Sequence, residues 1–201
     1  MLRTALALAM LLFAAMPALA GDQAGAVSQA KGNATGSIEG ARHPLDVGAS
    51  VFMNEVLATA AAARLEVTLL DTTKLTLGEK AQLRIDSFVY SGKRTRTLKF
   101  AAVGALRMIS SGDKPPGAQV VVRTPVVEIG IRGTDFWTGP IDGQFGVLLL
   151  AGAVSVSNAA GAVVLNQPGE GTNIAGPGSA PGPVTQWPQQ KVDRALAEVA
   201  F

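Results

Sequence analysis

The sequence contains no cysteine and one histidine among its 201 residues. Without cysteine, the protein forms neither a disulfide bond nor a thiolate metal site. A single imidazole, His43, excludes a metal site built from several histidines and leaves little room for a Ser-His-Asp triad. Because His43 precedes Pro44 in a stretch rich in glycine and alanine, we expect it to lie in an exposed loop.

Excess charge and long apolar runs are also scarce. The chain has 17 basic and 15 acidic residues, so its pI of 9.2 reflects a small imbalance and argues against a nucleic-acid-binding surface. After residue 20 the longest apolar run, Phe145 to Val154, contains two glycines and is shorter than the roughly 18 residues of a membrane helix. We therefore expect the mature chain to be soluble.

The first twenty residues have the pattern of a secretory signal peptide. Arg3 precedes an apolar stretch from Ala5 to Met16, and Ala18-Leu19-Ala20 supplies the A-x-A sequence at which such peptides are cut. The pattern predicts cleavage after Ala20 and a mature protein in the periplasm. An uncleaved membrane anchor is the alternative, although the apolar stretch is short for one.

The hydrophobic pattern predicts an all-β fold. Leu65, Val67 and Leu69 alternate with polar residues, as in a strand with one buried face. Short strands with tight glycine turns fit an irregular β-solenoid or a sandwich-like stack, and no strict repeat marks a regular β-helix. Strands are predicted at 26–30, 56–59, 65–70, 74–77, 83–85, 97–100, 105–109, 120–123, 126–129, 135–138, 146–150, 154–157 and 162–165.

The C-terminal part is expected to differ from the β domain, which we place at residues 21–166. Residues 167–187 are rich in proline and glycine, which predicts a flexible or extended linker. Beyond Pro188, a residue suited to the first turn of a helix, apolar residues recur at helical spacing: Val192, Leu196 and Val199. This pattern predicts a short amphipathic helix within residues 188–201. Two arrangements remain open: the helix packs on its own domain with Trp187 as anchor, or it docks in a groove of a partner.

The stretch from Arg123 to Phe136, R-T-P-V-V-E-I-G-I-R-G-T-D-F, combines two strand-like runs with a Gly-Ile-Arg-Gly turn. Pro125 lacks an N–H group and holds Thr124 in an extended conformation, so both suit the start of a strand. We expect Gly130 and Gly133 to provide positive φ angles or a close approach of backbones.

Within this motif, Arg132 and Asp135 are spaced to pair across a tight turn, and Thr134 can bond the neighbouring backbone. On this structural interpretation, Arg132→Ala lowers stability by roughly 2–4 kcal/mol. On the alternative interpretation, Arg132 binds an anionic ligand.

The motif resembles the signature of FecR-domain proteins, bacterial periplasmic domains named after a regulator of iron-citrate uptake. The resemblance covers about Val47 to Val156 and implies an irregular stack of short strands, including strand for the alanine-rich residues 54–65 that would also suit a helix. Further matching segments occur in the same order: Asp46–Gly48, Val56–Thr59, Ala63–Val67, Lys74–Gly78, Ala81–Asp86, Gly104–Arg107 and Ala151–Val154. The resemblance implies a structural role for Thr124, Pro125, Gly130, Arg132, Gly133, Thr134, Asp135 and Phe136.

A basic cluster follows Tyr90-Ser91-Gly92 and is predicted to lie at the tip of a hairpin. Its members are Lys93, Arg94, Arg96 and Lys99. Such a cluster is either a solvated turn or a contact for anionic envelope polymers. The carboxylates Asp71, Glu79 and Asp86 lie on separate predicted elements, and acid–base catalysis would require them to converge. We therefore predict no catalytic residue, metal site or cofactor.

Two functional hypotheses follow. The first is a non-enzymatic periplasmic module that binds or scaffolds a protein or a cell-envelope polymer. The alternative, implied by the resemblance, is the periplasmic component of a cell-surface signalling pathway. Iron-transport regulators join a sigma-regulating cytoplasmic segment and a membrane helix to a FecR domain. Since this sequence resembles the domain alone, it would signal through a membrane partner.

Overall fold

The computed structural model describes residues 21–91, 94–110 and 115–201, and the predicted signal peptide, residues 1–20, lies outside this part. The elements in chain order are β1 (Gln23–Lys31), β2 (Ala34–Ile38), β3 (Ala41–Pro44), β4 (Ser50–Phe52), β5 (Val56–Thr59), β6 (Arg64–Leu69), β7 (Lys74–Leu77), β8 (Gln82–Ser91), β9 (Arg94–Val103), β10 (Leu106–Ile109), β11 (Gln119–Arg123), β12 (Glu128–Ile141), β13 (Gln144–Asn158), β14 (Gly161–Leu165), β15 (Glu170–Ile174), β16 (Thr185–Gln186) and α1 (Gln189–Ala197).

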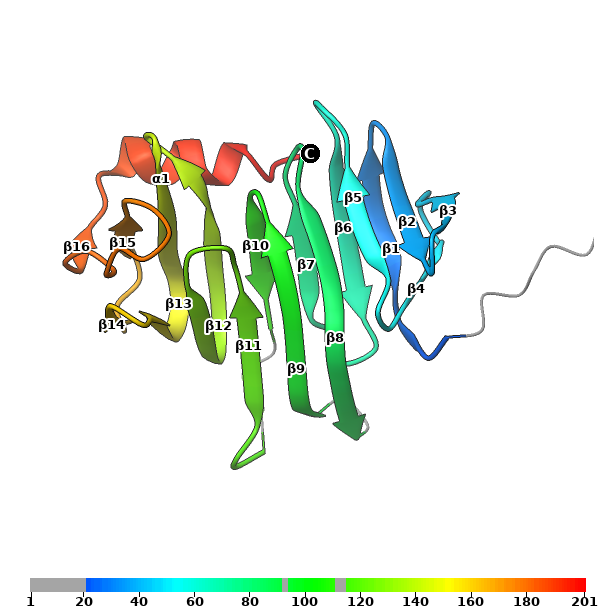
Figure 1. Cartoon of the computed structure of the whole chain (residues 1–201), viewed down its shortest axis with the longest axis horizontal. Helices are drawn as coiled ribbons and strands as arrows, with labels where there is room; N and C mark the ends of the chain where they lie inside the picture. Colours follow the sequence, from blue (N-terminus) through cyan, green and yellow to red (C-terminus); the bar gives the residue numbers. More distant parts are fainter. Residues whose placement is uncertain (1–20, 92–93, 111–114) are drawn as a thin grey trace, which may run out of the picture.

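The strands form one curled, mixed sheet with two limbs (Figure 1). The first limb has the order β3-β2-β5-β8-β9-β11, the second has the order β10-β7-β6-β1-β4, and β12 joins them. Strand β13 pairs with β12 and carries β14 and β15 at its other edge. The prediction of an all-β fold with a short C-terminal helix is confirmed, and the pairing favours its sandwich-like form over the solenoid.

One core lies between the two limbs. Leu83 of β8 and Phe100 of β9 meet Leu65 of β6 and Leu75 of β7 in a single apolar cluster, and each is at most 1% exposed. Period-2 alternation produces this cluster because every second side chain of a strand faces the same side. The two limbs therefore depend on each other for burial of their apolar faces.

The C-terminal helix covers the outer face of β12 and β13 (Figure 1). Ala195 and Val199 are buried in a second apolar cluster with Trp137 of β12, Leu148 of β13 and Trp187. The helix thus packs on its own domain in the structure, with Trp187 as anchor, which is the first of the two predicted arrangements.

Charge and ring contacts fix the helix in place. Asp142, in the turn between β12 and β13, lies 2.8 Å from Arg194 and 3.4 Å from Lys191. The ammonium of Lys191 also sits 4.1 Å from the centroid of a Trp187 ring, within reach of a cation–π interaction. Two glycines make room for Trp187, because a Cβ on Gly171 would overlap its indole and one on Gly146 would press on it.

We expect Gly171→Ala to lower the free energy of unfolding by about 1–3 kcal/mol, as overpacking does. The two tryptophans of the chain both lie in the helix cluster, so urea unfolding followed by tryptophan fluorescence reports on it. Gly176→Ala is the matched control, since a Cβ there meets no atom within 4 Å. Equal stability of the two variants would contradict the packing of Trp187 against Gly171.

The helix end should also respond to pH through Glu198. Burial raises the pKa of this carboxyl, Arg64 opposes the shift and Glu79 adds to it. Since the folded state then binds a proton more tightly than the unfolded state, stability is lost as pH rises above the ordinary carboxyl range. We expect Glu198→Gln to raise the melting temperature at pH 7 and to leave it unchanged at pH 3. A similar effect at both pH values would show that ionisation is not the cause.

Every predicted strand overlaps an observed one, and 56–59 and 64–69 are strands, as the resemblance implied. The predicted linker differs from the structure, because residues 167–187 contain β15 and β16. Gly171 and Thr172 are buried there, and the Thr172 hydroxyl donates a hydrogen bond to the Gly182 carbonyl at 2.8 Å. Gly171 in this segment serves close packing under Trp187.

The prediction of an exposed loop at His43 is wrong. His43 lies in β3, is half-buried, and places Nε2 2.7 Å from Oε1 of the fully buried Glu55. The other oxygen of Glu55 accepts a hydrogen bond from the backbone N–H of Phe52 at 2.9 Å. The contact spans twelve residues, and Gly36 leaves the space for it beside both side chains.

Candidate functional site

The motif begins with a tight turn between β11 and β12. The hydroxyl of Thr124 accepts hydrogen bonds from the N–H groups of Val126 and Val127 at 3.3 and 3.0 Å. The backbone N–H of Thr124 donates to the Val127 carbonyl at 2.9 Å. Pro125 occupies a position whose N–H is not needed for these bonds. Thr124 and Pro125 therefore lie in the turn that joins β11 to β12.

The centre of the motif is a bulge at which β12 passes from one limb to the other. Residues before it pair with β11, and residues after it pair with β10. The register against β13 shifts between Arg132 and Asp135. Gly133 has a φ of 55°, and Gly152 opposite has a φ of 83° and would overlap the Gly133 carbonyl if it carried a Cβ. Gly130 is not at positive φ, so that half of the expectation holds for Gly133 alone, and a Cβ on Gly130 would lie 2.6 Å from Oγ of Ser155.

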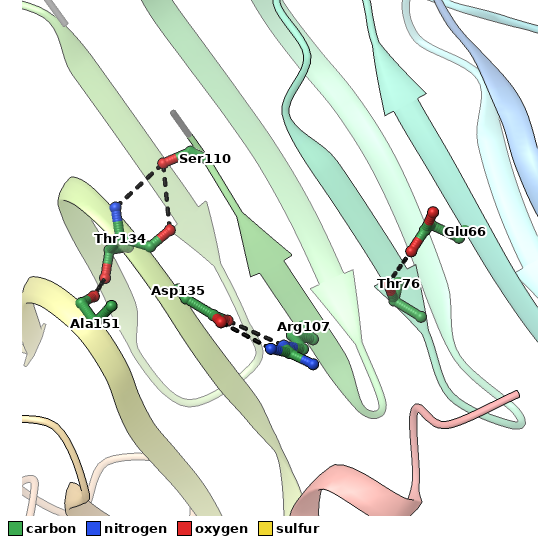
Figure 2. A network of polar contacts seen from close by, with 7 residues as sticks. All are labelled: Glu66, Thr76, Arg107, Ser110, Thr134, Asp135 and Ala151. Carbon is green, nitrogen blue, oxygen red and sulfur yellow. Dashed lines mark hydrogen bonds and ion pairs between the residues drawn. The ribbon is translucent and has the colours of Figure 1, made fainter. Parts of the chain in front are cut away.

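Hydrogen bonds hold the bulge from both sides (Figure 2). The backbone N–H of Ser110 donates to the Thr134 carbonyl at 2.9 Å, and the N–H of Thr134 donates to the Ser110 hydroxyl at 3.3 Å. The Thr134 hydroxyl donates to the carbonyl of Ala151 on β13. Phe136 then points into the main core and is fully buried. Thr134 thus links three strands and Phe136 contributes to the main core.

Asp135 pairs with Arg107 of β10, and the predicted Arg132–Asp135 pair is wrong (Figure 2). Arg107 Nε and one of its terminal nitrogens lie 3.0 and 2.7 Å from the two carboxylate oxygens, a bidentate arrangement. This hydrogen bonding raises the pKa of Arg107. The bulge separates Arg132 from Asp135, and Arg132 is exposed. Arg107 closes a segment that the resemblance included, but its role was not predicted.

A second group of polar side chains lies on the outer face of the second limb. Glu66 of β6 accepts a hydrogen bond from the Ser28 hydroxyl at 2.8 Å and lies 3.4 Å from Nζ of Lys74 and from the hydroxyl of Thr76. Burial raises the pKa of Glu66, but the Ser28 hydrogen bond and the Lys74 charge outweigh it, so the net shift is downward. The charges on this outer face are therefore paired with one another.

The outer face of the first limb carries cations of a different kind. Lys99 of β9 pairs in register with Val121 of β11, which in turn pairs with Gly130 of β12. Arg132 lies two residues beyond Gly130 and faces the same side, because the intervening Ile131 is buried. Lys99 and Arg132 are therefore two strands apart and offset by two residues along the strand, about 12 Å between their Cα positions.

Two adjoining hollows of about 670 and 390 Å³ follow this face, and both are lined by Ala118 and Ile131. Arg132 lines the larger hollow, and Lys99 and Gly130 line the smaller one. Among the described residues neither cation has a carboxylate within ion-pair distance, whereas Arg123 on the same face pairs with Glu128 at 3.0 Å. We call Lys99, Gly130 and Arg132 the basic face.

The structure describes only part of the basic cluster that was predicted at the hairpin tip. Lys93 lies outside the described residues, and Arg94 begins β9, with its side chain outside the description. Arg96 is exposed near the end of the hairpin, and Lys99 belongs to the basic face. The cluster therefore extends from the hairpin onto the sheet.

The acidic residues singled out in the sequence do not converge. Asp71 is buried and accepts hydrogen bonds from Thr73 and Thr95. Glu79 accepts the backbone N–H of Ala62, and Asp86 pairs with Arg84. Within residues 21–91, 94–110 and 115–201, no three histidine, cysteine or acidic side chains are grouped as metal ligands. Each of these three carboxylates thus has a partner of its own, and they form no acid–base pair with one another.

Residues 55–155 match the sequence profile of the family described as FecR protein. The chain belongs to the FecR family. The match spans β5 to β13 and includes the bulge, so the strands that join the two limbs are the family's own segment. No curated protein matches the chain.

Two crystal structures of a putative anti-sigma factor from Parabacteroides distasonis, at 2.50 and 1.65 Å resolution, share the fold. Each superposes with a TM-score of 0.58 at 20% sequence identity and covers 70% of this chain. The chain spans only 63–64% of the length of that protein. In the described part of the chain, no helix is both long and apolar enough to cross a membrane.

Side chains at the bulge and on the basic face should contribute differently to the free energy of unfolding. Asp135→Ala removes a bidentate, partly buried ion pair and should lower the free energy of unfolding by about 1–3 kcal/mol. Arg132→Ala removes an exposed side chain and should change it by less than about 0.5 kcal/mol, in place of the larger loss predicted from the sequence. Chemical unfolding of both variants measures this difference, and a larger loss for Arg132→Ala would restore the predicted corner pair.

Proposed function

We propose that this protein is a regulatory binding domain of a FecR-type signalling pathway. It acts in the periplasm, after removal of residues 1–20, and passes its signal through a membrane partner. The family membership of residues 55–155 carries the proposal. The fold shared with the Parabacteroides protein and the signal-peptide pattern of the N-terminus support it.

The basic face is the surface that we assign to this role. Lys99 of β9 and Arg132 of β12, on either side of β11, line open hollows, and the described residues offer them no carboxylate. Their positive potential attracts and orients an acidic surface. The strands below are fixed by the bulge and the core, so the backbone positions that carry the two side chains keep a constant separation. An acidic patch on the partner is the complement that this arrangement fits.

A second candidate function is the binding of an anionic cell-envelope polymer as a scaffold. The adjoining hollows favour it, because they form an open trough that crosses β11 and β12 and passes both cations. A charged chain can lie along such a trough without any pocket for its end. The two functions share the basic face and differ in what is bound.

The signalling proposal predicts a changed transcript profile under iron limitation in a deletion strain. Wild-type protein should restore the profile, and Lys99→Glu/Arg132→Glu should fail to restore it while accumulating to the same level. Lys31→Glu, at an exposed residue of β1, controls for a change of charge alone. A normal profile in the deletion strain would contradict the proposal.

Crosslinked capture from the cell envelope separates the two candidates. Both the wild-type protein and the double variant are used as bait, and bound protein and glycan are analysed. A membrane protein captured by the wild type and lost with the double variant supports signalling. A polysaccharide lost in the same way, without any protein, supports the scaffold function.

A further inference from the structure

A groove along the free edge of the first limb is a candidate for a second interaction surface. It differs from the basic face because apolar and acidic residues line it. Strand β5 pairs with β8 only at residues 82–84, and Asn54 adds one backbone bond to Ile85. From Asp86 to Ser91, β8 has a paired neighbour on one side, β9, and no described strand on the other. Figure 1 shows this part of β8 extending past the end of β5.

The groove runs beside this edge. Two adjoining hollows of about 480 and 490 Å³ share Asp22 and Met53, so they form one depression from the turn after β2 to the outer half of β8. Phe88 and Tyr90 line it with stacked rings, 4.7 Å between centroids. An open backbone edge and an apolar floor thus lie together, the combination that binds extended peptides.

The apolar lining is unusually open to solvent. Val89 is 52% and Tyr90 is 40% exposed, although both belong to strand β8 and line the same hollow as Met53. Single exposed apolar side chains are common, but several lining one depression indicate a surface that is covered in use.

The charged residues that line the groove indicate which kind of peptide it can bind. Asp22 and Glu39 line the groove, both are exposed, and neither forms a salt bridge with another described residue. The third carboxylate, Asp86, is already paired with Arg84 at 2.6 Å. Neither hollow is lined by lysine, arginine or histidine. Once residues 1–20 are removed, as we propose, the α-amino group of Gly21 also lines this end, so one cation faces two carboxylates. The groove is therefore apolar at the β8 end and net negative at the other, which complements an extended segment carrying apolar and basic side chains.

We propose that this groove binds an extended, basic and apolar peptide segment of a partner protein. Six residues of free edge, Asp86 to Ser91, correspond to about 20 Å of extended chain. The β-bulges at Ile85/Ser87 and Val89/Tyr90 interrupt the regular ladder, so uniform strand addition is disfavoured. Side chains in the hollows provide the specificity, with apolar groups against Phe88 and Tyr90 and a cation beside Asp22 and Glu39.

The test is fluorescence anisotropy of the full chain with labelled peptides of sequence KVKVKV, EVEVEV and KSKSKS. The first should bind at least about tenfold more tightly than the other two, which is about 1.4 kcal/mol, and less tightly as salt increases. Equal binding of EVEVEV would overturn the charge argument, and equal binding of KSKSKS would overturn the apolar one. Absence of binding by KVKVKV at millimolar concentration would overturn the proposal.

Variants locate the site. Asp22→Lys/Glu39→Lys should weaken KVKVKV binding by about tenfold, and Tyr90→Ser should do so through the apolar end. The matched control is Asp46→Lys/Asp193→Lys, which makes the same change of charge at two exposed acids that do not line the groove. Unchanged melting temperatures verify that the variants fold. Equal affinity of the groove variants and the control would overturn the assignment.

Hydrogen exchange identifies the edge and the occupant. Amides of residues 86–91 should gain protection when KVKVKV is added. Protection that appears at β3 or β14 would place the peptide elsewhere and overturn the proposal. Protection of 86–91 that rises with protein concentration alone would assign the edge to a second copy of this chain. Because binding is measured directly, this result is independent of the transcript profile, and either proposal can fail while the other stands.

Discussion

The whole arrangement of strands depends on a close contact between two backbones, Gly133 of β12 and Gly152 of β13. Both residues have positive φ angles, and no Cβ fits at Gly152 beside the Gly133 carbonyl. The bulge at this contact lets one strand pair with β11 before it and with β10 after it. A strand that continued without the bulge would remain in one limb, and the apolar faces of the two limbs would not meet.

The sequence contains the local signals of this arrangement but not its long-range pairs. The alternation of Leu65, Val67 and Leu69 marks a strand in any context, and Thr124-Pro125 marks a turn, because both depend on neighbouring residues alone. Asp135 instead finds Arg107, which is 28 residues away, and His43 finds Glu55. Such pairs depend on which strands lie side by side in the fold. A search for partners nearby in the sequence therefore gave Arg132 as the wrong partner for Asp135.

The C-terminal segment shows the same distinction for glycine. A run rich in glycine and proline predicts flexibility, since glycine has more accessible backbone conformations than other residues. Gly171 and Gly146 instead provide the space that Trp187 fills. The same residue type is used for freedom in one context and for the absence of a side chain in the other. Composition does not separate the two uses, because the deciding contact is with Trp187, which lies sixteen residues beyond Gly171.

The distribution of charge separates the faces that bind from those that hold the fold. On the second limb, Glu66 is paired with Lys74 and Arg107 with Asp135, and α1 covers the adjoining apolar surface. A partner there would have to displace existing contacts. On the first limb, Lys99 and Arg132 have no such internal partners among the described residues. Binding through these two cations costs no internal ion pair, which is the physical reason for which we propose the first limb as the side that meets other molecules.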